Sequence, residues 1–441
     1  MSCVSSKQRA LSRLRISFAV LAALSATATP SLAAAATQAE LEAKVQSLAE
    51  QLAALQAELA QMKAQQGANS SSAPAGAPAV TSATAAPSSG SASPLSFFGY
   101  GELNYSQPRD NTADTTADLA RFVLGVGYRF DDRTRLVSEV ELEHAVSSSE
   151  DPGEVEVEQA YIEHQLTNSI FAKAGLFLIP TGLLNENHEP TRYYGVFRNF
   201  VETAIIPTTW REGGLAIQGN SEIGLRWDAG VSTGFDLSKW DATATEGQES
   251  PLGSIHQELA LAHGKDLSVF GALNYTGVPG LRVGASVFTG GASQGGEELL
   301  SDAHITLWEG HVRWTPGAFD VSGLYARGHI SNTRSFNSTK VGNPTLIPEN
   351  FFGWYLQGAY RLLDHGRYNF SPFVRYERFN TASDYAALPA GLTPDTLADQ
   401  KVWTTGFNLG FAPGVVLKAD YQWFRDSALS DRFDLGIGYQ F

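Results

Sequence analysis

Apolar and polar residues alternate along the C-terminal three quarters of the chain, in segments of about ten residues between residues 96 and 441. The last segment has an apolar side chain at every second position: Phe433, Leu435, Ile437, Tyr439 and Phe441. Because successive side chains of a strand point to opposite faces, this pattern predicts strands with one apolar and one polar face. Tilted strands of this length can cross a bilayer.

The connections between these segments alternate in length. Short turns, such as residues 131–132, 167–168 and 413–414, alternate with long connections, such as residues 179–210, 236–266 and 380–400. Soluble β-sandwiches also alternate apolar and polar residues, but short turns on one side and long loops on the other are typical of membrane barrels. The pattern therefore predicts an all-β transmembrane barrel with an aqueous lumen.

We count about 16 antiparallel strands, with both ends of the barrel on the short-turn side. They begin near residues 96, 118, 133, 154, 169, 211, 222, 267, 281, 303, 318, 351, 367, 401, 415 and 430. Residues 255–263 are ambiguous, and an additional strand there would change the count.

Three different segments precede the barrel. Residues 1–36 resemble a secretory signal peptide, with basic Lys7, Arg9, Arg13 and Arg15, a short apolar stretch and alanines suited to cleavage. Residues 37–66 carry apolar residues at heptad spacing and predict a helical coiled coil in the periplasm. A single amphipathic helix or a partly disordered spacer is the alternative. Residues 67–95 are rich in Ala, Ser and Pro and predict a flexible linker.

The composition narrows the class of protein. The formal net charge is −15, and cleavage of the basic signal would make it more negative. A nucleic-acid partner is excluded, since phosphate binding needs a basic face. The only cysteine is Cys3, so the mature chain has no disulfide. The terminal Phe441 resembles the signal by which the outer-membrane assembly machinery recognises barrels. The expected surroundings are outer-membrane lipid and lipopolysaccharide.

The connection at residues 179–210 is long and rich in aromatic and charged residues, which is typical of a functional loop. Its flanks, KAGLF before it and PTTWREGG after it, resemble the porin O/P family, the phosphate-selective porins. The resemblance covers about residues 96–441. It implies a homotrimer of sixteen-stranded barrels, in which an inward-folded third loop narrows a lumen lined by basic residues.

Several charged residues are candidates for that constriction. The basic candidates in or beside the loop and on inward strand positions are Arg192, Arg198, Arg211, Lys173, Arg226, Arg375 and Lys418, with Arg282 and Arg313 in the same phase. The acidic candidates on the third and fourth strands are Glu139, Glu141, Glu156 and Glu158. Acidic side chains are disfavoured in lipid, so we expect them to face the lumen. There they either set selectivity or only solvate the wall and hold the loop.

The aromatic loop residues Tyr193, Tyr194 and Phe197 could form a stacking track for sugars, but packing of the loop against the barrel is the favoured interpretation. The histidines lack convincing metal spacing, and His144 and His164 are the one pair that could share neighbouring strands. We therefore predict no metal and no cofactor.

These features predict a passive outer-membrane channel for small polar solutes, with phosphate and other anions as candidates. A structural tether, in which the coiled coil links the outer membrane to the cell wall, is compatible with transport. An outer-membrane barrel enzyme would need a Ser/His pair at the lipid-facing rim, and the sequence offers none. We expect no enzymatic activity.

Overall fold

The computed structural model describes residues 93–148, 151–296, 298–425 and 431–441. The predicted signal peptide and coiled coil, and the linker up to residue 92, lie outside the described residues. The first strand begins at Leu95, inside the predicted end of the linker. All described residues belong to one unit, Ala79–Phe441.

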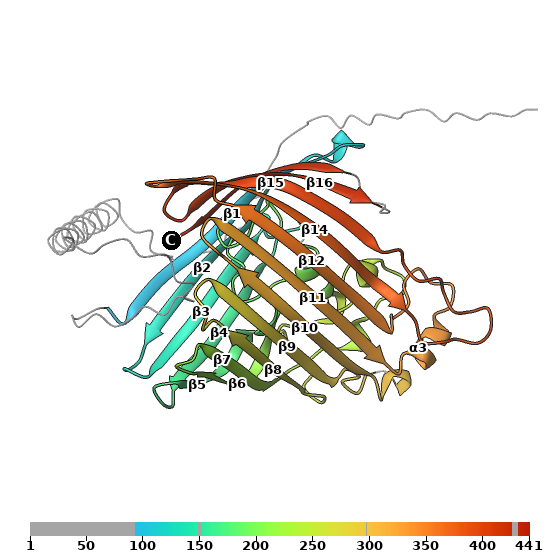
Figure 1. Cartoon of the computed structure of the whole chain (residues 1–441). Helices are drawn as coiled ribbons and strands as arrows, with labels where there is room; N and C mark the ends of the chain where they lie inside the picture. Colours follow the sequence, from blue (N-terminus) through green and yellow to red (C-terminus); the bar gives the residue numbers. More distant parts are fainter. Residues whose placement is uncertain (1–92, 149–150, 297, 426–430) are drawn as a thin grey trace, which may run out of the picture. The chain divides into compact units, whose positions relative to one another are not determined.

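Among the described residues, seventeen strands form one antiparallel sheet that closes on itself, because β1 pairs with both β2 and β17 (Figure 1). The strands are β1 (Leu95–Pro108), β2 (Thr116–Arg129), β3 (Thr134–Glu143), β4 (Val155–Gln165), β5 (Ile170–Leu178), β6 (Arg211–Asn220), β7 (Leu225–Ser232), β8 (Ser268–Tyr275), β9 (Leu281–Gly291), β10 (His304–Trp314), β11 (Phe319–Ser331), β12 (Asn350–Tyr360), β13 (Leu363–His365), β14 (Tyr368–Asp384), β15 (Gln400–Ala412), β16 (Val415–Arg425) and β17 (Arg432–Gln440).

The short β13 and the longer β12 both pair with β14, so together they form one interrupted strand. The barrel therefore has sixteen strands, as predicted. Each begins within three residues of its predicted start. Residues 255–263, the ambiguous segment, contain no strand.

The connections follow the predicted alternation. Residues 130–133, 166–169 and 413–414 are short turns, whereas residues 179–210, 233–267 and 332–349 are long connections. The amide of Gln440 bonds to the carbonyl of Gly414, and the amide of Arg129 bonds to the carbonyl of Pro94. Both ends of the barrel therefore lie on the short-turn side.

The long connections contain only short helices: η1 (Thr112–Asp114), the π-helix η2 (Val201–Ile205), η3 (Leu237–Lys239), α2 (Glu246–Glu249), η4 (Gly253–Ile255), η5 (Glu298–Leu300) and α3 (Arg334–Thr339). No helix in the described part of the chain has the length and apolar character needed to cross a membrane.

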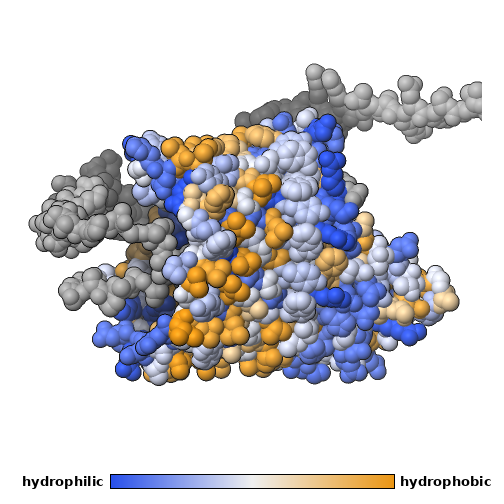
Figure 2. Space-filling view, in the orientation of Figure 1, coloured by the Kyte–Doolittle hydropathy of each residue, from blue (hydrophilic) through white to orange (hydrophobic). Residues whose placement is uncertain are grey.

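The outer face of the strands carries the apolar half of the alternation (Figure 2). Leu124, Leu215, Leu273, Trp308 and Leu356 are exposed large apolar side chains on five different strands. On the surface of a protein surrounded by water, such exposure would be unfavourable, but it is the arrangement that a bilayer stabilises. Trp314 and Trp403 are likewise exposed, at 50% and 46%.

The lumen is not uniformly polar, and this corrects the expectation of an aqueous lumen. A hydrophobic core occupies part of it, built from residues 179–210, residues 233–267 and inward side chains of the strands. Trp210 is fully buried at its centre, with its ring centroid 4.5 Å from that of Phe288 and 5.2 Å from that of Phe235. The reason is that several inward strand positions, such as Ile305 and Leu307, are themselves apolar.

One irregularity in the wall affects the acidic residues. The register between β3 and β4 shifts after the pair Glu139 and Gln159, because the next pair is Val140 and Val157. Glu158 is therefore the extra residue of a β-bulge. A bulge of this kind turns two consecutive side chains to the same side of a strand. Glu158 and Gln159 consequently both face the lumen.

Candidate functional site: the loop folded across the lumen

Residues 179–210, which we call the lumen loop, cross the inside of the barrel. Four contacts define its path: Thr181 with Ser286 of β9, Tyr193 with Glu102 of β1, Tyr194 with Asp320 of β11, and the amide of Val196 with Asp420 of β16. Because β9 and β1 lie half a turn apart in the sixteen-stranded barrel, the loop spans it from one side to the other. The prediction of an inward-folded third loop therefore matches its position in the structure.

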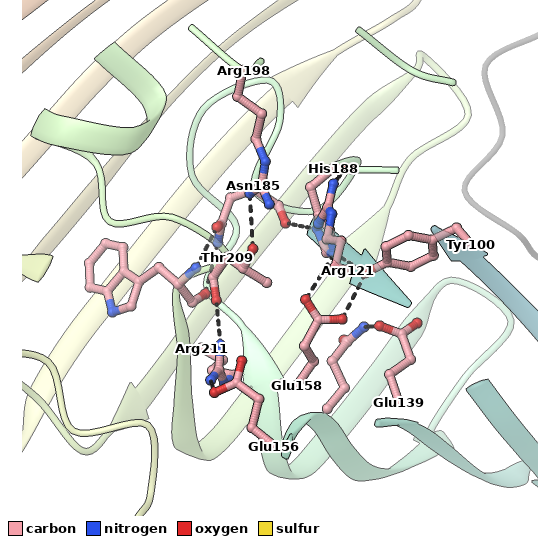
Figure 3. A network of polar contacts seen from close by, with 12 residues as sticks. Tyr100, Arg121, Glu139, Glu156, Glu158, Asn185, His188, Arg198, Thr209 and Arg211 are labelled. Atoms are coloured by element: carbon pink, nitrogen blue, oxygen red, sulfur yellow. Dashed lines mark hydrogen bonds and ion pairs between the residues drawn. The ribbon is translucent and has the colours of Figure 1, made fainter. Parts of the chain in front are cut away.

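The two ends of the lumen loop are joined by one side chain. The side-chain Nδ2 of Asn185 donates to the backbone carbonyls of Ile179 (2.7 Å) and Trp210 (2.8 Å). The side-chain Oδ1 of Asn185 accepts from the backbone amide of Trp210 (2.7 Å). Asn185 thereby gives hydrogen-bond partners to buried backbone groups at both ends of the loop, which is why a buried loop is tolerated here. Figure 3 shows Asn185 between Thr209 and His188.

Glu202 organises the middle of the loop. One carboxylate oxygen accepts from the amides of Leu183 (2.8 Å) and Leu184 (2.7 Å). The other accepts from Asn199 Nδ2 (3.0 Å) and from the hydroxyl of Tyr355 on β12 (2.9 Å). A buried carboxylate with four donors is well satisfied and fixes its surroundings.

The acidic wall of β3 and β4 faces the lumen, as predicted, but most of it is covered. Glu139, Glu141 and Glu158 are buried, whereas Glu156 is half-buried and pairs with Arg211 at 2.5 Å. These carboxylates contact the lumen loop and neighbouring strands. Their arrangement agrees with the interpretation that they hold the loop, and it removes them from a freely accessible pore surface.

A second group on β1 and β2 meets the same wall. Arg121 donates to Glu102 (2.8 Å) and to the carbonyl of His188 (2.6 Å), and the hydroxyl of Tyr100 donates to Glu158 (2.7 Å). The sequence pattern did not single out four of these site residues: Tyr100, Glu102, Arg121 and His188. Their inward phase was a signal for the three strand residues; nothing in the spacing indicated His188.

Three residues that were expected to line the pore are instead buried against the lumen loop, and this corrects the expectation. Arg375 pairs with Glu377 (2.7 Å) and donates to the carbonyl of Tyr194 (3.1 Å). The ammonium of Lys418 lies 3.5 Å from the ring centre of Tyr193. Arg211 is buried between Glu156 and Glu258. All three point inward as predicted, but they support the loop instead of lining an open surface.

Other predicted basic residues form a row on the wall nearer the short turns. Arg282 and Arg313 are direct cross-strand partners on β9 and β10. Arg226 on β7 pairs with Glu186 (2.8 Å) and Asp228 (2.9 Å), and Arg313 pairs with Asp320 (2.6 Å). Lys173 on β5 is half-buried, 5.4 Å from the ring centre of Tyr161.

The loop residues Arg192 and Arg198 differ from the buried arginines. The Arg192 side chain is 41% exposed and lies 4.0 Å from Glu189. Arg198 is half-buried and donates to the hydroxyl of Thr209 (2.9 Å). Both remain candidates for contact with a solute.

The aromatic residues of the loop pack against the barrel, which is the interpretation favoured from the sequence. Tyr193 donates to Glu102 (2.8 Å), Tyr194 stacks on Phe373 with 5.7 Å between ring centres, and Phe197 lies below the guanidinium of Arg432 at 4.6 Å. They do not form an exposed stacking track.

A cavity of about 260 Å³ lies where the loop meets the wall near the short turns. Its lining includes Arg192, Tyr193, Tyr194, Arg313, Asn408 and Gln440. Among the described residues that line it, none is acidic. The cavity therefore presents several neutral hydrogen-bonding groups and two guanidinium groups, each of which also lies beside a carboxylate outside the lining, Glu189 for Arg192 and Asp320 for Arg313.

The long connection between β7 and β8 supports the loop from the other side. Its Glu258 pairs with Arg211 (2.8 Å) and with His256 (3.1 Å). Burial by itself raises the pKa of Glu258, but the hydrogen bond and charge of His256 and the charge of Arg211 outweigh it and lower that pKa below its usual value.

The histidine pair considered from the sequence does not come together. His164 pairs with Thr134 at the start of β3, whereas His144 follows the end of β3 and bonds to Asp118 (2.7 Å). These two side chains lie at opposite ends of the strands.

Comparison with known proteins identifies one sequence relative. An uncharacterized protein of Aquifex aeolicus is 30% identical over 358 residues, which cover 79% of this chain and 80% of the relative. The chain belongs to the same family as this protein. No family model matches the sequence of the present chain. The likeness to phosphate-selective porins therefore stays a prediction.

Solved structures show what fold this family has. Salmonella typhi OmpF in complex with daunomycin superposes with a TM-score of 0.53 at 14% identity, over 79% of this chain and 97% of OmpF. A loop-deletion mutant of the Vibrio cholerae outer membrane protein OmpT gives a TM-score of 0.50 at 14% identity, over 79% of this chain and 99% of that one. The fold is thus that of a porin-like closed barrel.

Proposed function

We propose that the protein is an outer-membrane porin, a passive diffusion channel for small polar solutes. The observation that carries this proposal is the lumen loop, which is held across the inside of a closed barrel whose outer strand face is apolar. In a closed barrel, the backbone hydrogen-bonding groups pair with one another and need no water, so the barrel is stable in lipid. A loop folded inward narrows the lumen of such a barrel without blocking it. The likeness in fold to OmpF supports the proposal.

We further propose that the channel favours anions. The cavity beside the loop is lined by Arg192 and Arg313 and by no described carboxylate, while the acidic wall is buried and engaged in contacts. Guanidinium groups match the oxygens of phosphate and carboxylate solutes, and the low-dielectric wall strengthens their field. Phosphate is the candidate solute that the sequence resemblance adds.

Conductance across planar bilayers tests both parts. Mature protein should give ion-conducting steps, and a reversal potential in asymmetric KCl should have the sign of chloride preference. Added phosphate should reduce the chloride current if it enters the same constriction. Absence of conductance would contradict the channel. Cation preference would contradict the anion proposal and leave a general porin.

The proposal includes the placement of the chain in the envelope. The short turns and both barrel ends would face the periplasm, together with the predicted coiled coil, and the barrels would associate as homotrimers. The barrel assembly machinery would recognise the terminal Phe441. Cross-linking of the native protein tests the trimer, and protease accessibility in intact cells tests the orientation.

A second role is supported by the heptad seam within residues 37–66. A coiled coil of about three heptads is marginal alone and is stabilised by association, so the segment could also tether the outer membrane to the cell wall. Deletion of residues 37–94 should weaken envelope integrity in that case but leave the single-channel conductance unchanged.

A further inference from the structure

Three buried side chains from three different segments converge on one point of the acidic wall. Glu139 of β3, Glu158 of β4 and His188 of the lumen loop each offer one ligand atom, and these atoms all lie within 4.8 Å of one another. We propose that these three side chains bind a divalent transition-metal ion such as Zn²⁺. No metal was expected from the sequence, because its histidines lack convincing metal spacing.

The ring of His188 is oriented for a ligand. Its Nδ1 lies 2.9 Å from the carbonyl oxygen of Asn185, and a carbonyl can only accept, so Nδ1 carries the proton. In the neutral ring, Nε2 then bears a lone pair. Metal-binding histidines almost always donate their second nitrogen in this way, usually to a carbonyl or a carboxylate.

Tyr100 can donate to only one of its two neighbours. Its hydroxyl lies 2.7 Å from Glu158 and 2.6 Å from Nε2 of His188, but it has one proton to donate. When that proton goes to Glu158, the lone pair of His188 has no donor from Tyr100. A cation at this point would satisfy it.

Glu158 is aimed at the same point by the β-bulge described above. It is fully buried, and no N–H or hydroxyl group of the described residues donates to its Oε1, whose neighbours are the carboxyl of Glu141 and the ring of His188. This oxygen lies 3.4 Å from His188 Nε2. Two ligands at zinc bond lengths and a tetrahedral angle are separated by about 3.4 Å, so the observed spacing suits one ion between them.

Glu139 is held in position as the third ligand. Gln159, the second residue of the bulge, donates 2.8 Å to one oxygen of Glu139. Such a hydrogen bond from a neighbouring side chain is the usual means by which a protein orients a carboxylate ligand. The bulge thus supplies one ligand, Glu158, and the side chain that orients another, Glu139.

The local charge also favours a cation. Glu102 is neutralised by Arg121 at 2.8 Å, which leaves Glu139, Glu141 and Glu158 with His188 as the basic group between them in the described structure. Buried charges without compensation are strongly unfavourable. Shared protons could compensate them instead, and that is the alternative the experiment must separate. One imidazole and two carboxylates suit Zn²⁺ or Mn²⁺ better than Ca²⁺ or Mg²⁺, which prefer oxygen ligands.

The test uses the full mature chain, folded in detergent and stripped with EDTA. Titration calorimetry with Zn²⁺ and elemental analysis after dialysis should give one ion per chain. Glu158→Gln and His188→Gln should each weaken binding at least about tenfold, since each removes a direct ligand. Bound Co²⁺ should give a visible absorption band that both variants lose.

Glu309→Gln is the matched control. Glu309 is also fully buried and also contacts a histidine, His311 (2.9 Å), but the pair has no third ligand in the described structure. The affinity of the Glu309→Gln variant for Zn²⁺ should equal that of the unmodified chain. Folding of every variant is checked by the change in electrophoretic mobility on heating. Should Glu158→Gln fail to fold, His188→Gln in the loop decides.

Two outcomes would overturn the site. Lack of stoichiometric Zn²⁺ binding by the unmodified chain would mean that protons neutralise the cluster. Equal binding by the unmodified chain and the folded His188→Gln variant would place the ion elsewhere. Neither outcome bears on conductance, so the metal site and the channel stand or fall separately.

Discussion

The hydroxyl of Tyr355 donates a 2.9 Å hydrogen bond to Glu202, and this contact connects the wall of the barrel to the middle of the lumen loop. The same carboxylate also binds the amides of Leu183 and Leu184 at the start of the loop. One buried side chain therefore joins β12, the π-helix and the first turn of the loop. This arrangement makes the position of the loop depend on Glu202.

Substitution Glu202→Gln should release the loop. An amide group presents a donor where the carboxylate presents an acceptor, so at least one buried donor loses its partner, at a cost of about 1–3 kcal/mol. We expect noisier single-channel currents and faster proteolysis between residues 180 and 210. Glu222→Gln, in an exposed turn, is the control. Current noise equal to that of the unmodified chain would show that the loop does not depend on this carboxylate.

Trp210→Ala should weaken the hydrophobic core inside the barrel. The indole is fully buried against Phe235 and Phe288, and removal of such a side chain typically costs about 3–5 kcal/mol. Urea denaturation followed by electrophoretic mobility measures the loss. Trp314→Ala is the matched control, because Trp314 is 50% exposed on the outer face. Similar losses for the two variants would contradict the internal core.

The barrel could be predicted from the sequence because strand alternation is a local property. Each strand shows its phase within ten residues, and the phase correctly places Arg375 and Lys418 on the inner face. Their burial could not be predicted in this way. It depends on where residues 179–210 run after they leave the wall, and that path is decided by contacts with β1, β11 and β16, which are distant in sequence.

The candidate metal ligands illustrate the same limit. The alternation predicted that Glu139 and Glu158 face the lumen. It could not reveal the β-bulge that turns Glu158 and Gln159 to the same side of the strand. Nor could it reveal the turn of the lumen loop that brings His188 to the two glutamates. A bulge is hard to recognise within one short strand, because the residues before and after it each alternate normally and only the single step between them breaks the pattern.

Charge reversal of the loop arginines Arg192 and Arg198 tests which residues a permeating ion meets. Arg192→Glu and Arg198→Glu should each shift the reversal potential toward cation preference, since each exchanges a positive for a negative charge near the lumen. Measurements at about 0.01–0.1 M salt keep screening weak. Arg133→Glu, in an exposed turn, is the control. An unchanged reversal potential would place these arginines outside the pathway.

Neutralisation separates the exposed arginines from the buried ones. Arg375→Met leaves Glu377 buried without its partner, which should cost about 3–5 kcal/mol of stability. Arg192→Met should leave stability nearly unchanged, because its side chain is 41% exposed. Urea denaturation of both variants measures this difference. A stable Arg375→Met variant would contradict the supporting role of the pair.

Acidification should loosen the connection between β7 and β8. The folded pKa of Glu258 lies below its unfolded value, about 4.3. Its ion pairs therefore contribute stability that is present above about pH 4.3 and is lost as the pH falls through the lower, folded pKa. Hydrogen exchange of residues 233–267 should increase in that acidic range. Glu258→Gln should show rapid exchange already at neutral pH, and its exchange should depend less on pH than that of the unmodified chain. If both proteins respond to acid equally, another group controls the connection.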